Sequence, residues 1–242
     1  MFGSDRKLPV SGGAEKRSYV HSMFSAIAPR YDLLNHVLSF NLDRLWRRRT
    51  VRLLGWERTP GGMYLDLCAG TLDLAVALAR HPEFTGTVVG ADFVMRMLQL
   101  GRQKSSQVVP LNADALVLPF PDETFDGATV GFGVRNLTDL AQGFREVARV
   151  LKPGARYVVL ELSTPQDQPL RGTYLLYFRH LLPLIGRAVS KHTNAYSWLP
   201  ASVLAFPEPD ALSEVMEASG FDRVSHDLLF GGACAIHVGT KS

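Results

Sequence analysis

Hydrophobic side chains recur every three to four positions in the first quarter of the chain. Val20, Met23, Phe24 and Ile27 follow this spacing, and Tyr31, Leu34 and Leu38 continue it. The spacing predicts helices with one apolar face. A further helix is predicted over residues 42–54, with Trp46 and Val51 inward and its arginines outward. A Thr-Pro-Gly-Gly loop at 59–62 ends this segment, so residues 1–60 are interpreted as an N-terminal helical cap.

From residue 63 onward, short apolar runs alternate with helical patterns. Strands are predicted at 63–68, 87–90, 107–111, 125–130 and 156–162, and helices at 72–80, 95–104 and 139–151. This alternation implies crossover connections and a mostly parallel sheet with helices on both faces. The predicted fold is therefore α/β and Rossmann-like, with residues 61–242 forming one domain.

Two departures from the alternation follow. Residues 168–206 predict a helical insertion. After a helix at 210–219, runs at 223–230 and 233–239 are separated by Gly231-Gly232, which predicts a closing β-hairpin. The apolar residues of the insertion suggest a groove for a lipid tail or an interfacial membrane contact. A helix pair covering the sheet and a homodimer face remain alternatives.

Composition limits the class of protein. The chain has 242 residues, of which 46% are hydrophobic and 20% charged, so we expect one globular domain with additions. Two cysteines are too few for a disulfide scaffold. The N-terminus has no apolar core for a signal peptide, and the most apolar run, 174–190, is interrupted by charge and proline. We therefore expect a cytoplasmic protein.

The charge is unevenly distributed. Residues 1–60 hold eleven Lys/Arg and five Asp/Glu, a net of +6, while the remaining residues hold fifteen and eighteen, a net of −3. Nucleic-acid binding is disfavoured because the basic residues lie on one helix with little aromatic interleaving. A peripheral contact with the inner membrane surface or a solvated helix face explains the charge equally well.

The first predicted strand ends in a turn of small residues that opens a helix. Ligands of parallel α/β sheets bind beyond the carboxyl ends of strands, and Gly70 allows a ligand to approach the backbone. Asp92 follows the next strand, where a carboxylate can accept both hydroxyls of a ribose. These features suggest an adenosine-containing cofactor, with an ordinary turn and incidental acids as the alternative.

The acids around the turn distinguish between two cofactors. A dinucleotide needs a G-x-G-x-x-G loop, whereas this turn has one glycine with Asp66 before it and Asp73 after it. Carboxylates repel a pyrophosphate but suit an ammonium and a sulfonium. S-adenosyl-L-methionine carries both cations, so the charge favours this methyl donor over NAD.

Further candidates lie after the later strands. Phe93 is placed to stack near an adenine. Asp114 and Ala115 follow the third strand, where a carboxylate and a backbone N–H can form hydrogen bonds with the edge of the adenine. No histidine or cysteine spacing indicates a metal site. The candidate cofactor-binding residues are Asp66, Gly70, Thr71, Asp92, Phe93, Asp114, Ala115 and Gly131.

Three segments between about Tyr19 and Lys241 carry a family resemblance. Residues 31–39 read Tyr-Asp-Leu-Leu-Asn-His-Val-Leu-Ser, residues 132–139 read Phe-Gly-Val-Arg-Asn-Leu-Thr-Asp, and residues 149–155 read Arg-Val-Leu-Lys-Pro-Gly-Ala. The chain resembles the class I S-adenosylmethionine-dependent methyltransferases. More narrowly, it is similar to the ubiquinone/menaquinone biosynthesis C-methyltransferases.

The resemblance implies a lipid-soluble polyprenylated quinol as acceptor. This is demethylmenaquinol or the 2-methoxy-6-polyprenyl-1,4-benzoquinol of ubiquinone synthesis. The candidate catalytic residues are Arg135, to stabilise a phenolate, Asn136, to orient the same oxygen, and Tyr31, which with Asp32 closes over the ring. A salt bridge of Arg135 to an acid such as Asp139, a turn role of Asn136 and core packing of Tyr31 remain open.

Three positions depart from the family pattern. Leu34 replaces a usual methionine, Asp43 a usual histidine, and Leu72 the second glycine of Gly-Thr-Gly-Asp. Leu72 is expected to add bulk at the mouth of the methionine site. Leu72 and Asp43 therefore keep two alternatives open: a related methyltransferase acting on another small aromatic or lipid, and a catalytically silent protein of the same fold.

Overall fold

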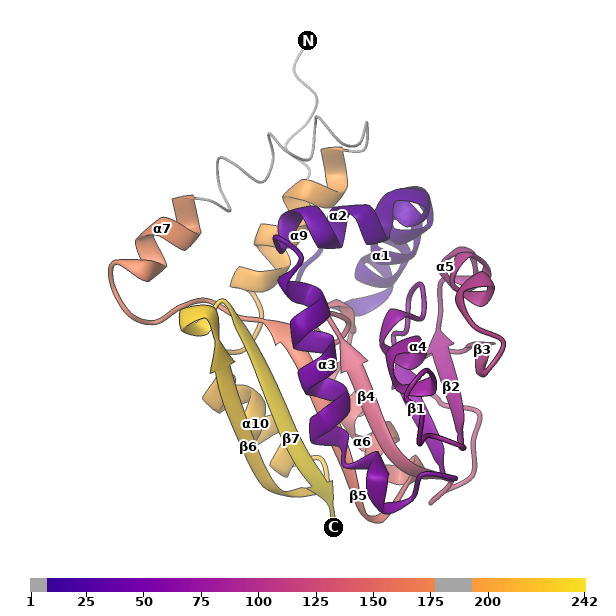
Figure 1. Ribbon diagram of the computed structural model, residues 1–242. Coiled ribbons are helices and arrows are strands. Elements are labelled where there is room, and N and C mark those ends of the chain that lie inside the picture. Colours follow the sequence, from indigo (N-terminus) through magenta and orange to yellow (C-terminus); the bar gives the residue numbers. More distant parts are fainter. Residues whose placement is uncertain (1–7, 177–192) are drawn as a thin grey trace.

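The computed structural model describes residues 8–176 and 193–242. A seven-stranded sheet in the order β3-β2-β1-β4-β5-β7-β6 forms its centre (Figure 1). The strands are β1 (Met63–Leu67), β2 (Thr87–Asp92), β3 (Val108–Asn112), β4 (Phe125–Gly131), β5 (Leu151–Leu162), β6 (Phe221–Leu229) and β7 (Cys234–Lys241). The first five run parallel, and β7 pairs antiparallel with β5 and β6. The predicted mostly parallel sheet and closing hairpin are confirmed.

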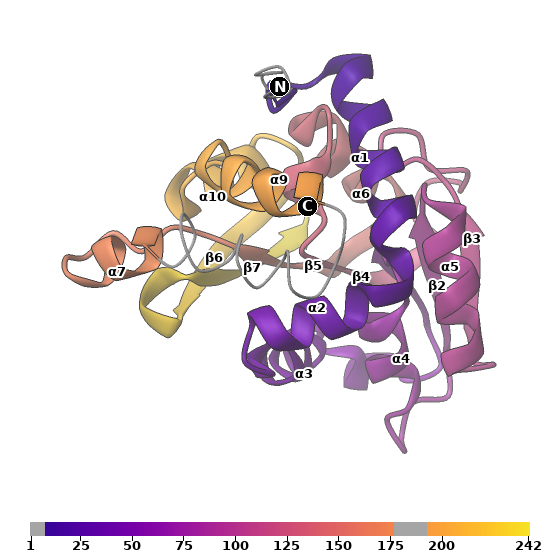
Figure 2. The ribbon, with the colours of Figure 1, turned by 90° about the horizontal axis from the view of Figure 1, so that it is seen from above.

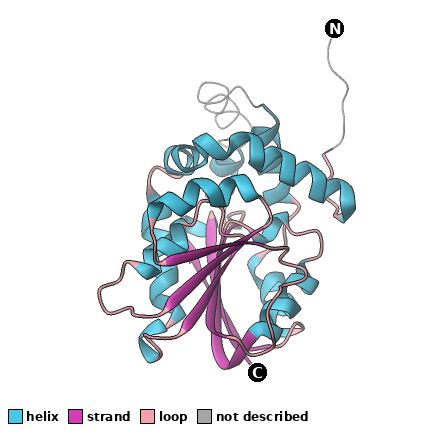
Figure 3. Cartoon of the chain, turned by 90° about the vertical axis from the view of Figure 1, so that its right-hand side faces the viewer, coloured by secondary structure: helices cyan, strands magenta, loops and turns pink. Residues whose placement is uncertain are grey.

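Helices cover both faces of this sheet (Figure 3). The α-helices of the described residues, some of which lie at the end of the sheet instead, are α1 (Gly13–Ile27), α2 (Tyr31–Leu38), α3 (Leu42–Leu54), α4 (Asp73–Ala79), α5 (Met95–Gly101), α6 (Leu140–Val150), α7 (Leu170–Leu176), α9 (Thr193–Leu204) and α10 (Pro209–Glu217). Short 3₁₀ turns are η1 (Ala28–Arg30), η2 (Trp56–Arg58), η3 (Arg102–Lys104), η4 (Val134–Asn136) and η6 (Phe230–Gly232).

The alternation along β1 builds two core clusters. Leu65 and Leu67 pack with residues of α6 and α10 on one face, while Tyr64 packs with residues of α3, α4 and α5 on the other. Successive side chains of a strand point to opposite faces, so one strand supplies both cores. The sheet is thereby fixed between two helical layers.

The N-terminal quarter divides between two places. Helix α3 packs on the sheet, and its Trp46, Val51 and Leu54 are buried in the core. Helices α1 and α2 instead lie across the carboxyl ends of the parallel strands, with α9 beside them (Figure 2). We call α1 and α2 the cap helices. Because α3 is part of the sheet layer, the cap helices are the part of residues 8–60 that covers the ligand-binding edge.

One expectation for α3 is corrected. Arg44, Arg48 and Arg49 are exposed as predicted, but the Arg47 side chain is only 12% exposed. Its guanidinium pairs with Asp43 at 3.5 Å and with Asp73 at 3.8 Å. Arg47 therefore points into the contact between α3 and α4, where it lies between Asp43 of α3 and Asp73 of α4.

The start of β5 is also corrected. The sequence predicts a helix that ends at residue 151 and a strand that begins at residue 156, yet β5 begins at Leu151, which pairs with Phe125. The next pair joins Gly127 to Arg156, so the register shifts between the two pairs. A bulge accommodates a proline that an ordinary ladder position would exclude.

The insertion is described in part. Helices α7 and α9 belong to it, whereas most of the apolar run proposed as a tail groove lies in residues 177–192, outside the described residues. No helix within the described ranges is long and apolar enough to cross a membrane. The described residues also contain no group of three or more His, Cys, Asp or Glu placed to hold a metal ion.

Candidate active site

Two neighbouring cavities lie between the cap helices and the strand ends. The first, cavity A, adjoins the ends of β1 and β4, where the strand order reverses. Such a switch point is the usual ligand position of an open α/β sheet. Its lining is Arg17, Val20, Phe24, Tyr31, Cys68, Gly70, Ala91, Asp92, Phe93, Val94, Met97, Ala113, Asp114, Ala115, Leu116, Phe132, Gly133, Asn136, Leu137 and Thr138.

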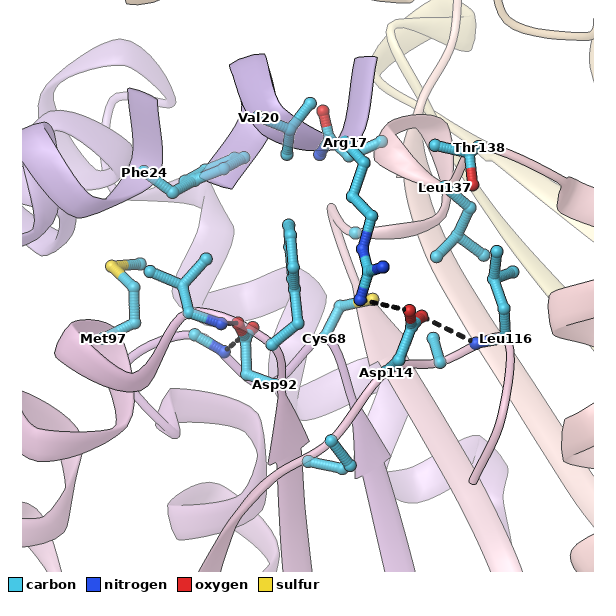
Figure 4. A pocket seen from close by; sticks show the side chains of 18 of the residues that line it. Arg17, Val20, Phe24, Cys68, Asp92, Met97, Asp114, Leu116, Leu137 and Thr138 are labelled. Carbon is cyan, nitrogen blue, oxygen red and sulfur yellow. Dashed lines mark hydrogen bonds and ion pairs between the residues drawn. The ribbon is translucent and has the colours of Figure 1, made fainter. Parts of the chain in front are cut away.

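Asp92 organises the floor of cavity A. Its Oδ2 accepts the Gly70 N–H at 2.9 Å and its Oδ1 accepts the Val94 N–H at 2.8 Å (Figure 4). Burial raises the pKa of Asp92, while these backbone donors lower it and limit the rise. Gly70 has φ +53°, a conformation that favours glycine. Asp92 and Gly70 thus fix the turn after β1 against the end of β2.

Asp114 is held from the opposite wall. Its Oδ1 accepts the Leu116 N–H at 3.0 Å, and its Oδ2 pairs with Arg17 at 2.7 Å. Arg17 reaches down from α1 across cavity A (Figure 4). With Arg17 in this position, cavity A has a volume of about 70 Å³.

Three predicted cofactor residues are not among the described residues that line cavity A. Asp66 accepts the Ala75 N–H at 3.0 Å and the Thr129 hydroxyl at 3.2 Å, and burial raises its pKa to about 7. The Thr71 hydroxyl donates to Asp32 of α2, and Gly131 is the last residue of β4. Their part in cofactor binding stays a prediction.

The expected position of Leu72 is corrected. Its side chain is fully buried, and it belongs to the core cluster beneath α3 and α4. It fills the space above two glycines. A Cβ added to Gly90 would lie 2.3 Å from Leu72 Cδ2, and a Cβ added to Gly101 would lie 2.8 Å from Leu72 Cγ. Because its side chain lies in this core and is not among the described residues that line cavity A or the larger cavity beside it, Leu72 does not narrow a ligand entrance.

The second cavity, cavity B, is larger and apolar. It has about 470 Å³ and lies between the cap helices, α3, α7 and α9. Phe24, Tyr31 and Phe132 border both cavities. Its lining is Met23, Phe24, Ile27, Tyr31, Leu34, Asn35, Leu38, Ser39, Phe40, Leu42, Asp43, Trp46, Phe132, Arg135, Leu162, Pro165, Leu170, Thr173, Tyr174, Trp198, Leu199, Phe230 and Ala233.

Arg135 lies in the wall of cavity B with its charge balanced. One guanidinium nitrogen contacts Glu161 at 2.7 Å, and the Arg135 N–H donates to the same carboxylate at 3.2 Å. The salt-bridge alternative is therefore present with Glu161, while Asp139 accepts the Gln142 N–H at the start of α6. Within the described part of the chain, Arg135 Nε has no hydrogen-bond partner.

Asn136 lines cavity A, and Tyr31 lines both cavities. Asn136 Oδ1 accepts the Trp198 indole N–H at 2.9 Å, so Asn136 joins η4 to α9. The Tyr31 ring packs edge-on against Phe24, with 5.8 Å between centroids. Burial raises the pKa of Tyr31, which keeps the phenol neutral. Each of the two side chains thus contacts a neighbouring residue and also lines a cavity.

Comparison with known proteins assigns a family. Residues 13–241 match the ubiE/COQ5 methyltransferase family. The chain belongs to this family. A ubiquinone/menaquinone biosynthesis C-methyltransferase of Geobacter sulfurreducens is 41% identical, over 98% of this chain and 94% of its own. A demethylmenaquinone methyltransferase of Thermus thermophilus is 48% identical, over 90% of this chain and 100% of its own. A demethylmenaquinone methyltransferase of Deinococcus radiodurans is 43% identical, over 98% of this chain and 99% of its own.

Solved structures agree on the fold of this ubiE/COQ5 family member. A Thermotoga maritima S-adenosylmethionine-dependent methyltransferase, described as a possible histamine N-methyltransferase, has a TM-score of 0.64 at 20% identity, covering 91% of this chain and 99% of its own. The [4+2]-cyclase SpnF also has a TM-score of 0.64, at 18% identity over 92% and 94%. Similarity at this level confirms the class I methyltransferase fold and leaves the reaction to the site residues.

Residues of α1 contribute to the site of this family member without a clear sequence signal. Lys16 Nζ donates to the Leu137 carbonyl at 2.7 Å and to the Arg135 carbonyl at 3.1 Å. Burial lowers the pKa of Lys16, and the charge of Arg135 lowers it further. Val20 and Phe24 belong to the apolar stripe of the sequence, whereas Lys16 and Arg17 are polar residues without any motif.

Proposed function

We propose that this chain transfers a methyl group from S-adenosyl-L-methionine to a ring carbon of a polyprenylated quinol. The observation that carries the proposal is the contact between cavities A and B at Phe24, Tyr31 and Phe132. Cavity A offers the buried carboxylate of Asp92 and the partly exposed carboxylate of Asp114 at the strand ends, and cavity B offers a large apolar volume. A donor and an aromatic acceptor bound in this way meet at the shared wall, which supplies the alignment a displacement needs.

The residues around cavity A fit the adenosine part of the donor. Asp92 keeps a second lone pair on each oxygen for ribose hydroxyls, because each oxygen accepts one backbone N–H. Phe93 and Asp114 lie beside it on the adenine side. When bound, the donor supplies a methyl group already activated by a sulfonium. The task of the chain is to orient the two molecules and to manage the acceptor's proton.

The acceptor fits cavity B by size and polarity. About 470 Å³ lies within the range of small-molecule sites, and the walls are mainly apolar. Glu161 holds the Arg135 guanidinium in the wall of cavity B, where its positive charge stabilises the oxygen that becomes negative. Arg135 stays protonated, so another group receives the proton. A hydrophobic tail leaves past Phe40, Leu170 and Phe230, which line cavity B and are exposed.

Demethylmenaquinol is the preferred acceptor. Two of the three relatives quoted above are named demethylmenaquinone methyltransferases, and the third carries both pathway names. The 2-methoxy-6-polyprenyl-1,4-benzoquinol of ubiquinone synthesis is the second candidate.

A turnover assay tests the proposal. The purified chain is incubated with S-adenosylmethionine and a short-chain demethylmenaquinol, and the ring methyl group is detected by mass spectrometry. Methylation of the naphthoquinol in preference to the benzoquinol is expected. Calorimetry that gives no heat at high micromolar donor would reject both enzyme hypotheses. Donor binding without turnover on any quinol would favour another small aromatic or lipid acceptor.

We also propose that the mouth of cavity B rests on a membrane surface. Exposed apolar side chains at Leu33, Phe40, Leu45 and Phe230 lie on α2, α3 and the turns beside them. Arg44 and Arg48 are exposed on the same helix as Leu45. Apolar residues flanked by arginines suit an interfacial contact with anionic lipid, from which a quinol tail can enter.

A further inference from the structure

His36, Ser39 and Asp43 form a hydrogen-bonded cluster between α2 and α3. Asp43 Oδ2 lies 2.9 Å and Oδ1 3.0 Å from His36 Nδ1. The Ser39 hydroxyl donates to Asp43 Oδ1 at 2.9 Å. Arg47 Nε lies 3.5 Å from Asp43 Oδ2 on the other side. These three side chains connect a buried carboxylate to a partly exposed imidazole.

This cluster borders the proposed acceptor cavity. Ser39 and Asp43 line cavity B, and Asp43 is the one carboxylate among the described residues of that lining. Phe132 contacts both α3 and Arg135. Phe132 packs against Trp46 with 6.2 Å between centroids, and its carbonyl accepts from Arg135. The carboxylate and Arg135 therefore belong to the same wall region.

The charges around Asp43 keep it ionised. Burial raises its pKa, but hydrogen bonds from His36 and Ser39 and the charge of Arg47 hold the pKa below its usual value. Asp73 of α4 lies behind Arg47, and Lys104 of η3 pairs with Asp73. The Asp43 side chain is 1% exposed and that of His36 is 25% exposed, so the cluster runs from the cavity toward solvent.

Other groups near the cavities are poorly placed to accept a proton. Arg135 is already protonated, and the raised pKa of Tyr31 keeps its phenol neutral. Glu161 is bound by Arg135, and Asp92 is held by two backbone N–H groups at the floor of cavity A. The acceptor of the quinol proton is thus sought on the α2–α3 side.

We propose that Ser39, Asp43 and His36 form the route by which the proton of the acceptor's hydroxyl leaves cavity B. This inference rests on the proposed quinol methylation. Ser39 Oγ accepts the hydroxyl proton while its own proton passes to Asp43 Oδ1. The proton then passes from Asp43 to the His36 imidazole through the hydrogen bond between them, and the exposed side of the imidazole releases it to water.

The step balances with the reaction. The electron pair of the broken O–H bond moves through the ring to the neighbouring carbon, which bonds to the methyl carbon as the sulfur–carbon bond breaks to leave a neutral thioether. The hydrogen on the methylated carbon then leaves as a proton, and the oxygen regains one. One proton is released per turnover, and the Ser39–Asp43–His36 route carries it.

A binding experiment without donor tests the contact itself. Trp46 and Trp198 line cavity B, so their fluorescence reports binding of naphthalene and of 1-naphthol, which adds one hydroxyl. A hydroxyl bonded toward a carboxylate is expected to favour 1-naphthol about tenfold or more in the unaltered chain. Asp43→Asn and Ser39→Ala should each reduce this preference by about tenfold. The control is Asp227→Asn, which removes the surface partner of Arg49. Arg49 lies on α3, as Asp43 does, and this variant should retain the preference.

The kinetic test uses the pH profile. At pH 7, Asp43→Asn should lower kcat by about 100-fold or more, with the KM for the donor unchanged. The loss should shrink as the pH rises, because the quinol hydroxyl then ionises without a protein base. A merely structural role would give a loss independent of pH. His36→Gln should show a smaller loss of the same form.

The outcomes separate this inference from the proposed function. If the unaltered chain methylates a quinol and Asp43→Asn does so equally well, or if its loss persists at every pH, the proton route is wrong. If no quinol is methylated, the proposed function fails, and the naphthol preference still decides whether the cluster binds a hydroxyl. Melting curves check folding, and Ser39→Ala with His36→Gln decide the matter should Asp43→Asn not fold.

Discussion

Asp92 shows how one carboxylate can serve both the turn and a ligand. Its two oxygens each accept one backbone N–H, from Gly70 and from Val94. We predict that Asp92→Ala raises the Kd for S-adenosylmethionine about 10- to 100-fold, because the ribose hydroxyls lose a charged acceptor. Isothermal calorimetry measures this, with Asp92→Asn expected to lie between. Unchanged affinity in a folded Asp92→Ala protein would show that the ribose is placed wrongly.

Leu72 combines a left-handed backbone with a fully buried side chain. We predict that Leu72→Ala lowers the free energy of unfolding by about 2–5 kcal/mol, because it leaves a cavity above Gly90 and Gly101. Leu72→Gly should be no less stable than Leu72→Ala, since glycine adopts the positive φ without strain. Urea denaturation measures both.

Donor binding provides the control for Leu72. Because its side chain lies in the core, both variants should bind S-adenosylmethionine with unchanged affinity where they are folded. A several-fold gain in affinity on Leu72→Gly would instead place the side chain at the methionine site.

Sequence reasoning located the candidate residues better than the direction of their side chains. Positions after strands follow from the alternation, so Asp92 and Asp114 were found where cavity A lies. The same reasoning could not tell that Asp66 faces α4. In β1, Asp66 shares the Tyr64 face, and only the packing of α4 shows that its N-terminal N–H groups lie there. A carboxylate near a turn has the same sequence signal in either orientation.

At the scale of elements, local patterns succeeded and long-range contacts did not. Helix α3 was predicted with its observed ends because its apolar spacing and the following loop are local signals. The inward turn of Arg47 depends on Asp73, which lies in another element. The early start of β5 depends on pairing of Leu151 with Phe125. Periodicity does not contain partners so distant in sequence.

The cap helices are attached to the site through charged side chains. Lys104 Nζ lies 2.7 Å from Asp32 of α2 and also contacts Asp73 at the start of α4. Lys16 joins α1 to η4, and Arg17 joins it to Asp114. These contacts hold α1 and α2 over cavity A.

Lys16→Met tests the attachment of α1. The substitution keeps the apolar stem and leaves the carbonyls of Arg135 and Leu137 without the ammonium. We predict a loss of about 1–3 kcal/mol in the free energy of unfolding and faster hydrogen exchange of residues 13–27. Lys152→Met, which breaks an exposed pair with Asp126, should change stability by less than about 0.5 kcal/mol. Unchanged exchange in α1 would contradict the attachment.

At the scale of the molecule, the exposed apolar side chains of Phe40 and Phe230 at cavity B and the exposed arginines Arg44 and Arg48 of α3 suggest one membrane-facing surface. We predict that the chain binds vesicles containing anionic lipid, and that added salt weakens binding because it screens the arginines. The double substitution Phe40→Ser with Phe230→Ser should weaken binding at least about tenfold by removing two apolar contacts. Sedimentation with vesicles measures this.

Val109→Ser is the matched control for vesicle binding. Val109 is 51% exposed but lies on β3, at the edge of the sheet. It should leave vesicle binding unchanged. If the double substitution instead abolishes a dimer seen by light scattering and vesicles are not bound, the apolar face joins two copies of the chain.

Stability as a function of pH reflects two buried groups with opposite effects. Burial lowers the pKa of His237 to about 4, so between about 6.5 and 4 only the unfolded chain is protonated there. This lowers stability as the pH falls. Burial raises the pKa of Asp66 to about 7, so between about 4 and 7 the folded chain retains a proton that the unfolded chain loses. This lowers stability as the pH rises.

Single substitutions should separate these two effects. In Asp66→Asn the Asp66 effect is absent, so between pH 4.5 and 6.5 the free energy of unfolding should rise by about 2 kcal/mol more than it does in the unaltered chain. In His237→Gln the Asp66 effect remains, and stability should fall by a similar amount toward pH 7. Urea denaturation across this range measures both, with Asp227→Asn as a surface control that stays parallel to the unaltered chain. Parallel curves for all the variants would mean that neither buried group changes its protonation on unfolding.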